Sequence, residues 1–244
     1  MCTLIVDWNP NNENYITVGA NRDERFGRPF EKFDERDNGV FCPLDVRGGT
    51  WIGVNRTGLF VALTNRYIGS HKRGMESRGK VVLDALTKGY VKNALSEIGK
   101  MDYDKYNSFN LILADSNQLV SVVNYHDRLV IQKLKPGLHS VTADWDIDDW
   151  GADRNAYISK EYNGDINVLK KILAYEGDEN LKGAVCVTDP NESHKTMSSC
   201  IVQGYCKIID TDIGRPHKVF KGFELHNTYQ KPDFDMWEYS RVGR

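Results

Sequence analysis

The opening residues predict a β-hairpin, and that hairpin constrains where the start of the chain can lie. Residues 2–8 are predicted to form a strand with one apolar face, made by Cys2, Leu4, Val6 and Trp8. The next six residues are rich in Asn and include Pro, which is typical of a loop, and residues 15–20 form a second strand. A hairpin centred on that loop places Cys2 opposite Asn21. The chain start therefore lies beside residues 21–24, which follow the second strand.

The start of the chain carries a candidate nucleophile. We expect Met1 to be removed before the small residue Cys2, which leaves a thiol and a free α-amine on one residue. The ordinary pKa is about 7.7–8.0 for an α-amine and about 8.5 for a Cys thiol, so the amine can accept the thiol proton near neutral pH. The neighbouring Asp23 carboxylate could hold the α-ammonium, and the Arg22 guanidinium could lower the thiol pKa. A polar stretch of this kind is also typical of a solvated strand end, and these residues alone leave both interpretations open.

Composition excludes several classes of protein. Apolar residues make up 40% and charged residues 27% of 244 residues, which is ordinary for a globular protein. The net charge of −2 gives no reason to expect nucleic acid or an anionic membrane as partner, and no apolar run reaches the ~18 residues of a spanning helix. We expect a cytoplasmic protein, because the N-terminus lacks a signal-peptide pattern and five cysteines form no disulfide framework. No linker or repeat divides the chain, which predicts a single domain over residues 1–244.

The order of the predicted elements indicates an α+β fold with segregated layers. Further strands are predicted at residues 51–54, 59–65, 110–114, 119–124, 128–134, 185–188, 198–203, 207–210 and 219–224. Helical periodicity appears at about residues 79–88, 90–101, 150–163 and 166–176. Residues 25–50 show no regular pattern and are expected to be irregular. Hairpins followed by helices, a meander and more hairpins favour antiparallel sheets over a βαβ arrangement.

Other motifs give weaker signals. Residues 74–81 miss the phosphate-binding loop pattern, because Val81 replaces the hydroxyl residue and no strand immediately precedes them. The six histidines never fall at metal-ligand spacing, so no metal is expected. Cys42-Pro43 resembles a dipeptide of some haem-responsive proteins, but the signal is two residues long.

Several ordered blocks resemble the NRDE family, which includes the transport and Golgi organisation 2 proteins. The first is Cys2 followed by residues 20–24, Ala-Asn-Arg-Asp-Glu, with Arg28-Pro29 close behind. The match continues at residues 49–55, 62–65, 77–79 and 106–111, and more loosely at 137–139. It is strong over roughly the first 140 residues and thin beyond.

The resemblance implies an N-terminal-nucleophile (Ntn) hydrolase fold, a four-layer αββα sandwich with two antiparallel sheets. By analogy with the choloylglycine and penicillin V acylase group, Cys2 is expected to be nucleophile and base, Asp23 the anchor of the amine, and Asn65 an oxyanion donor. Arg22 would tune the thiol or bind a substrate carboxylate. The expected substrate-binding residues are Asn21, Arg22, Glu24 and His139.

Two departures from the family pattern leave the function open. Relatives carry a Ser-Asn pair, whose Asn could be a second oxyanion donor, where this chain has Thr142-Ala143. Relatives also carry an Arg where this chain has Met197. Asp144 or Arg154 could compensate for these lost groups. One hypothesis is therefore a cysteine amidohydrolase acting on a small amide or acyl conjugate, and the other is a non-catalytic carrier. Because some relatives are implicated in haem trafficking, haem or another apolar metabolite is the expected ligand of a carrier. A structural role in Golgi organisation is a third, weaker alternative, and the oligomeric state stays open.

Overall fold

Two antiparallel sheets form the centre of the molecule. The computed structural model describes residues 2–25, 27–67, 72–180, 182–188, 194–209, 217–228 and 237–243. Within this part of the chain, one sheet has six strands in the order β10 (Gly137–Thr142), β1 (Thr3–Trp8), β2 (Asn14–Arg25), β11 (His194–Ile209), β12 (His217–Thr228) and β13 (Glu238–Val242). The other has seven strands in the order β3 (Phe30–Arg36), β4 (Val40–Asp45), β5 (Ile52–Asn55), β6 (Phe60–Asn65), β7 (Phe109–Ala114), β8 (Leu119–Asn124) and β9 (Leu129–Leu134).

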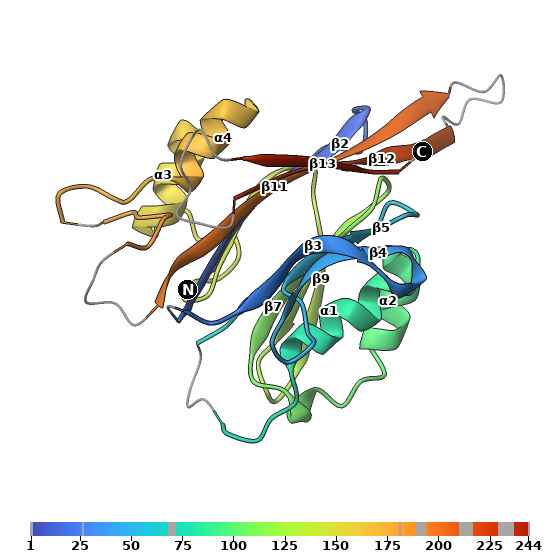
Figure 1. The fold of residues 1–244 in the computed structure, drawn as a ribbon, viewed down its shortest axis with the longest axis horizontal. Coiled ribbons are helices and arrows are strands. Elements are labelled where there is room, and N and C mark those ends of the chain that lie inside the picture. The colour runs from blue at the N-terminus through green and yellow to red at the C-terminus, as the bar shows by residue number, and fades with distance from the viewer. Residues whose placement is uncertain are drawn as a thin grey trace.

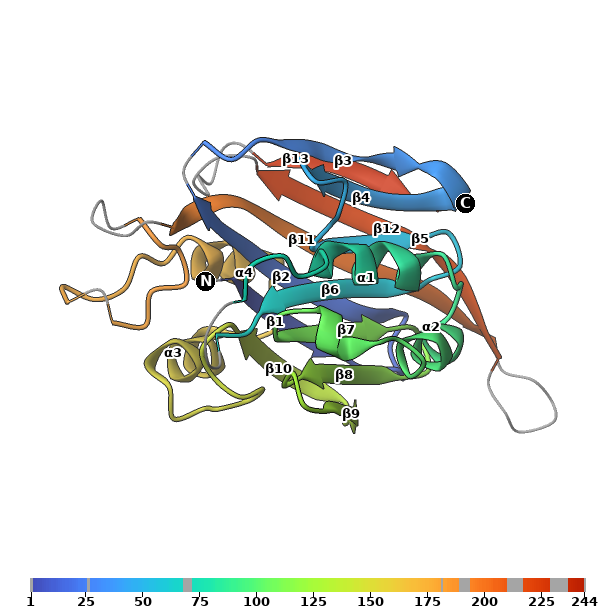
Figure 2. The same ribbon diagram turned by 90° about the horizontal axis from the view of Figure 1, so that it is seen from below.

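Helices cover the outer face of each sheet. In Figures 1 and 2, α1 (Arg78–Leu86) and α2 (Val91–Ile98) lie on the seven-stranded sheet. The helices α3 (Asp153–Glu161) and α4 (Ile166–Leu173) lie on the six-stranded sheet, near the chain start. Short 3-10 turns occupy Asp37–Gly39 and Tyr103–Lys105. The layers therefore follow the order αββα, and the predicted α+β sandwich is confirmed.

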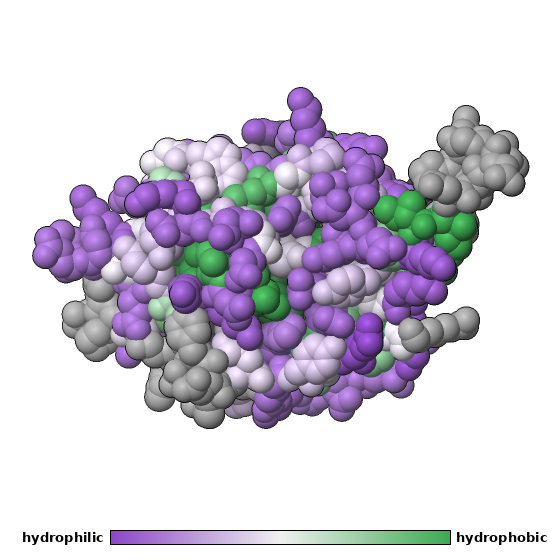
Figure 3. All heavy atoms as spheres, turned by 90° about the horizontal axis from the view of Figure 1, so that it is seen from above, coloured by the Kyte–Doolittle hydropathy of each residue, from purple (hydrophilic) through white to green (hydrophobic). Residues whose placement is uncertain are grey.

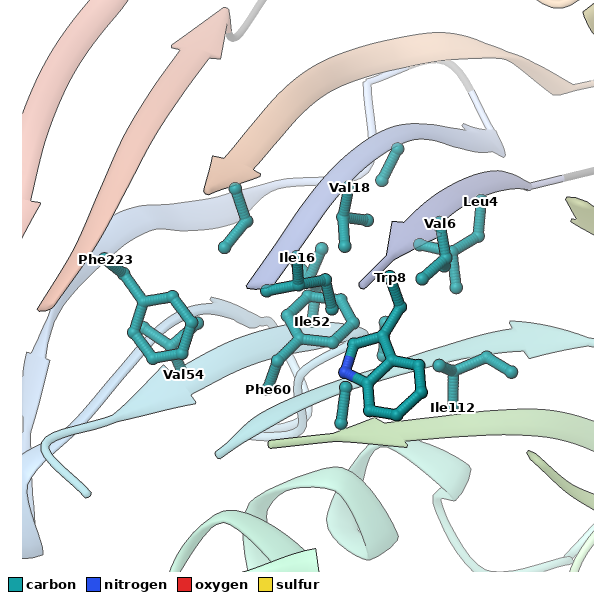
Figure 4. Packing of buried hydrophobic residues seen from close by; sticks show 14 of the residues in the cluster. Leu4, Val6, Trp8, Ile16, Val18, Ile52, Val54, Phe60, Ile112 and Phe223 are labelled. Atoms are coloured by element: carbon teal, nitrogen blue, oxygen red, sulfur yellow. The ribbon is translucent and has the colours of Figure 1, made fainter. Parts of the chain in front are cut away.

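The core between the sheets explains why the sheets stack. Leu4, Val6 and Trp8 of β1 point toward Phe60 of β6 and Ile112 of β7 (Figure 4), and all five side chains are buried. Because alternate residues of a strand face opposite sides, one face of each strand supplies this core. The Trp8 Nε1–H donates to the Asp115 backbone oxygen at 3.0 Å, so its polar atom is satisfied inside the apolar layer.

The opposite strand faces build two outer cores. Ile5 of β1 and Ile201 of β11 pack with Leu169 of α4. A Cβ on Gly19 of β2 would lie 2.8 Å from Leu169 Cδ1, so this glycine allows α4 to approach the sheet. A separate cluster, which includes Val61 of β6, packs beneath α1 and α2. Sheets buried on both faces explain why the strands have near-continuous apolar runs.

Most predicted elements are confirmed, but five details are wrong. Residues 25–50 contain the β3–β4 hairpin, and β10 was not expected as a strand. The strands expected at 198–203 and 207–210 are parts of the single strand β11, with residue 210 outside the described residues. Residues 185–188 form no strand, and β13 was missed. Charged side chains on β3 and a short edge strand at β13 hide the alternation on which the predictions rest.

The surface shown in Figure 3 is largely hydrophilic, with hydrophobic residues exposed in small separate areas. None of the helices in the described residues has the length and apolar character needed to cross a bilayer. The face shown in Figure 3 has no extended apolar surface.

Two isoleucines give a matched test of the central core. Ile112 is 1% exposed between the sheets, whereas Ile131 on β9 is 48% exposed. We expect Ile112→Ala to lower the free energy of unfolding by about 2–5 kcal/mol, because it removes buried methyl groups and leaves a cavity. Ile131→Ala should cost less than about 1 kcal/mol. Urea unfolding of both variants measures the difference, and equal losses would contradict the stacked-sheet core.

Candidate functional site

The central strand β1 places the chain start between two neighbouring strands. Thr3 pairs with Asn21 of β2 on one side and with Thr142 of β10 on the other. The hairpin prediction is therefore right in kind but one residue out of register, since Asn21 lies opposite Thr3 instead of Cys2. The Asn-Arg-Asp-Glu segment also lies inside β2, not beyond its end. Met1 lies outside the described residues.

The alternation of β2 sends neighbouring side chains of this segment to opposite faces of the sheet. Arg22 shares the face of Ala20 and lies against aromatic rings between the sheets. Asn21 and Asp23 point to the other face. The Asn21 amide donates to the backbone oxygens of Leu173 and Val185, at 2.8 and 2.9 Å. Asn21 therefore ties the α4 end to the sheet, and its contacts are not with the cleft.

Cys2 and Asp23 meet at the end of the sheet. The Cys2 Sγ donates to the Asp23 backbone oxygen at 3.8 Å, and the Asp23 Oδ1 accepts a hydrogen bond from the Thr196 hydroxyl at 2.6 Å. Burial raises the pKa of Asp23 to about 6, although the Thr196 hydrogen bond and the Arg154 charge oppose it. Burial also raises the pKa of the Cys2 thiol, against the opposing charge of Arg22. The thiol therefore needs a local proton acceptor to react near neutral pH.

Arg22 is held by aromatic rings. Its Cζ lies 4.4 Å from the Trp51 ring centroid and 4.9 Å from that of Phe30. Its ion pair with Glu24 is loose at 3.8 Å, and its buried Nη1 has no hydrogen-bond partner within the described structure. Arg28 binds Glu24 more closely, at 3.2 Å, which leaves the Arg22 charge weakly compensated. Burial lowers the pKa of Arg22 accordingly.

A cleft of about 670 Å³ opens at this end of the molecule. Cys2, Asp23 and Asn65 line it together, as do Arg22 and Glu24. The described lining includes seven basic residues: Arg22, Arg25, Arg28, Arg47, Lys72, Arg73 and Arg78. It includes four acidic ones: Asp23, Glu24, Asp45 and Glu76. The cleft is therefore basic although the whole chain has a net charge of −2.

Among the described residues, most of the basic side chains in the cleft form no salt bridge with a carboxylate. In the ranges that the structure describes, salt bridges to carboxylates engage only Arg22 and Arg28 among the seven. Arg78 instead donates from Nη1 to the Ser108 backbone oxygen at 2.9 Å, and burial lowers its pKa. A neutral acceptor leaves that charge uncompensated, so the cleft attracts anions.

His139 lies elsewhere. It sits on β10, where its Nδ1 is 2.7 Å from Asp148 Oδ2 and its Nε2 is 2.8 Å from the Lys135 backbone oxygen. It is not among the cleft residues. These contacts tie β10 to the loop before α3, and they raise the pKa of His139 even though burial alone would lower it.

Two residues that support the site were not identified as site residues from the sequence. The Thr196 hydroxyl, which binds Asp23, also accepts the Val187 N–H at 2.8 Å. Arg154 at the start of α3 donates from Nη1 to the Thr3 hydroxyl at 2.9 Å. Both come from positions far from the chain start; the sequence offered Arg154 only as a group that could compensate for the family departures, and Thr196 only as the neighbour of Met197. Arg78, which lines the cleft, was not predicted as a site residue either, although it lies in the block at residues 77–79 that resembles the family.

In the part of the chain that the structure describes, no cluster of His, Cys, Asp or Glu suits a metal ion. The five cysteines, all within the described residues, are free thiols, and four of them are buried.

Stacked antiparallel sheets between two helical layers define the Ntn-hydrolase fold, and solved structures of that class match this chain. The Caenorhabditis elegans N-acylethanolamine-hydrolyzing acid amidase ortholog matches with a TM-score of 0.55 and 17% identity, over 82% of this chain and 92% of that one. A variant of conjugated bile acid hydrolase from Clostridium perfringens matches with a TM-score of 0.51 and 12% identity, over 98% and 96%. At these identities the likeness shows the fold alone.

The sequence identifies the family within that fold class. The family model for Transport and Golgi organisation 2 matches residues 1–161, and the chain belongs to this family. The Transport and Golgi organization protein 2 homolog of Bos taurus is 34% identical over 47% of this chain and 45% of that protein. The Mus musculus homolog is 32% identical over 52% and 50%. The chain thus covers about half the length of these relatives.

The raised pKa of Asp23 predicts a specific pH dependence of stability. Its folded-state value of about 6 lies above an unfolded value of about 3.9, so the folded protein binds the extra proton between these limits. The free energy of unfolding should fall by about 3 kcal/mol as the pH rises through this window. Asp23→Asn should remove that fall, whereas Asp127→Asn, at an exposed position, should keep it. Urea unfolding between pH 3.5 and about 7.5 measures both; a slope unchanged in Asp23→Asn would contradict the assignment.

Proposed function

We propose that this protein is an N-terminal-nucleophile amidohydrolase that cleaves a small amide or acyl conjugate through an acyl-enzyme on Cys2. The observation that carries the proposal is that Cys2, Asp23 and Asn65 line one cleft at the end of β1. The proposal requires removal of Met1, because only then does Cys2 carry a free α-amine. Membership of a family with the Ntn-hydrolase fold agrees with this chemistry.

The residues of the cleft suit each step of amide hydrolysis. The Cys2 amine takes the thiol proton, and the sulfur attacks the amide carbon, so that a C–S bond forms and the carbonyl oxygen becomes an oxyanion. The Asn65 amide stabilises that oxyanion. The amine then returns the proton to the leaving nitrogen as the C–N bond breaks. Water attacks the thioester in the second half, which releases the acid and restores the thiol. Asp23 holds the ammonium in place.

The charge of the cleft favours an anionic substrate. Five of its basic residues have no salt bridge in the described part of the chain. Arg78 donates to a neutral backbone oxygen, and Arg22 lies against an aromatic ring with only a loose ion pair to Glu24. A carboxylate on the substrate would compensate them. We therefore propose an amide that carries an acidic group as the substrate class.

The state and reactivity of Cys2 test the nucleophile. Intact mass should show a mature chain that begins at Cys2, and iodoacetamide should label Cys2 faster than Cys42, Cys186, Cys200 and Cys206. Cys2→Ala should abolish turnover, and Asp23→Ala should lower kcat by roughly 10²-fold, because the ammonium loses its anchor. Asp127→Ala is the control, since Asp127 is exposed and remote from the lining. Retention of Met1, or slow labelling of Cys2, would contradict the proposal.

Arg78→Gln tests the charge preference. We compare succinyl and butyryl amides of 7-amino-4-methylcoumarin, which differ in a terminal carboxylate. The variant should raise KM for the succinyl amide roughly tenfold, because it removes a charged hydrogen bond worth about 1.5–3 kcal/mol. It should leave KM for the butyryl amide unchanged. Arg128→Gln, at an exposed position on the far β8–β9 turn, is the control. Equal effects on the KM of both amides would show that Arg78 does not bind the substrate carboxylate.

A non-catalytic carrier of the same fold is the second candidate. Ala143 favours it, because this chain has a methyl group at the position where the family resemblance implies an oxyanion Asn. A haem ligand receives less support, because charged residues dominate the described lining and Leu63, Met75 and Trp51 are its larger apolar members. Haem titration tests this version: a Soret shift that His194→Ala abolishes would support it, and the absence of a shift would remove it.

A further inference from the structure

The segment after β6 is tied to the segment after β10. The Tyr67 N–H donates to the Ala143 backbone oxygen at 3.0 Å, and the Arg66 N–H donates to the Ser108 oxygen at 3.1 Å. The Arg66 guanidinium donates to the Trp145 backbone oxygen at 3.1 Å and forms an ion pair with Asp146. The bonds to Ala143, Trp145 and Asp146 join the end of β6 in one sheet to the segment after β10 in the other, whereas the Ser108 bond stays within the seven-stranded sheet. Together they hold the Tyr67 backbone in one position.

Ala143 directly follows β10, and Cys2 directly precedes β1. Thr3 pairs with Thr142 at the end of the two strands, so one further step of that register leads to Cys2 and Ala143. Ala143 is 1% exposed, and its methyl group cannot donate a hydrogen bond. The β10 side of the nucleophile therefore supplies no side-chain donor at this position. The backbone of Tyr67, which binds the Ala143 oxygen, lies on this side of the site.

The Tyr67 side chain reaches into the same cleft. It lines the cleft together with Cys2 and Asn65, and it is 49% exposed. The Asn65 side chain lies near the phenol and partly offsets the effect of burial on the Tyr67 pKa. A phenol can accept one hydrogen bond and donate another. Burial raises the pKa of Tyr67, so the hydroxyl keeps its proton at neutral pH.

We propose that Tyr67 is a catalytic residue that donates its phenolic hydrogen to the oxyanion formed when Cys2 attacks a carbonyl. Tyr67 and Asn65 would then form a two-donor oxyanion hole, with Tyr67 replacing the amide that Ala143 lacks. This inference rests on the proposed Cys2 chemistry. It adds a donor to that chemistry and changes no bond-making step, because the proton stays on the phenol throughout.

Two reactions of Cys2 separate an oxyanion donor from a structural role. Acylation by p-nitrophenyl butyrate passes through a tetrahedral oxyanion, whereas alkylation by iodoacetamide is a direct displacement at carbon without one. Tyr67→Phe should slow acylation on the order of 10²-fold, the usual cost of one donor, and leave the alkylation rate unchanged. Tyr90→Phe is the matched control, because Tyr90 is 52% exposed and lies outside the cleft.

Restoring the missing amide gives a second test. In the double variant Tyr67→Phe/Ala143→Asn, the acylation rate should recover in part if the introduced side-chain amide supplies the donor that the phenol no longer provides. Thermal unfolding checks that the double variant folds; if it does not, the comparison of acylation with alkylation in Tyr67→Phe decides.

The outcomes distinguish the two proposals. If wild-type Cys2 is acylated and Tyr67→Phe acylates equally fast, the Tyr67 inference is wrong and the proposed function stands. If Tyr67→Phe slows acylation and alkylation alike, Tyr67 supports the thiol and not the oxyanion, which also overturns the inference. If wild-type Cys2 reacts with neither reagent, the proposed function itself is wrong, and the inference falls with it.

Discussion

The pairing of β1 with β2 on one side and β10 on the other is the constraint on which the site depends. Because β1 is an inner strand, its backbone hydrogen bonds are satisfied on both sides, and its register cannot slip without moving apolar residues out of two cores. The residue before it, Cys2, is thereby held between β2 and the start of the segment that follows β10. A residue at a chain end would otherwise be mobile.

The alternation of β2 places the charges of Arg22 and Asp23 on opposite faces of the sheet. Arg22 faces the space between the sheets, where aromatic rings and few carboxylates surround it, and Asp23 faces the other side, where Thr196 binds it. Burial raises the pKa of both Asp23 and Cys2, so desolvation works against a charged carboxylate and a thiolate alike. Under the proposed chemistry, the α-amine supplies the charge that balances Asp23 and the base that Cys2 needs.

Sequence reasoning succeeded where patterns are local and failed where distant segments meet. The β5–β6 hairpin and the helices α1 to α4 follow from apolar periodicity and turn residues. The β3–β4 hairpin was missed because β3 is half-exposed and charged, and a charged edge strand has no clear alternation. The grouping of Cys2, Asp23 and Asn65 came from family resemblance, and the structure brings all three to one cleft, whereas it gives His139 and Asn21 contacts elsewhere.

The sequence by itself determined the α+β class, the hairpin that brings the chain start to the Asn-Arg-Asp-Glu segment, and the family. The class and the hairpin depend on side-chain periodicity and short-range turns, which a single strand or helix carries in its own residues. The family depends on short ordered sequence blocks and their resemblance to those of known members. Only the tertiary structure decided which face of β2 each residue takes, which basic residues form no salt bridge within the described chain, and that Tyr67 binds the Ala143 backbone and lines the same cleft as Cys2. Those facts depend on register and on contacts between residues far apart in the chain, where a shift of one position reverses every side chain.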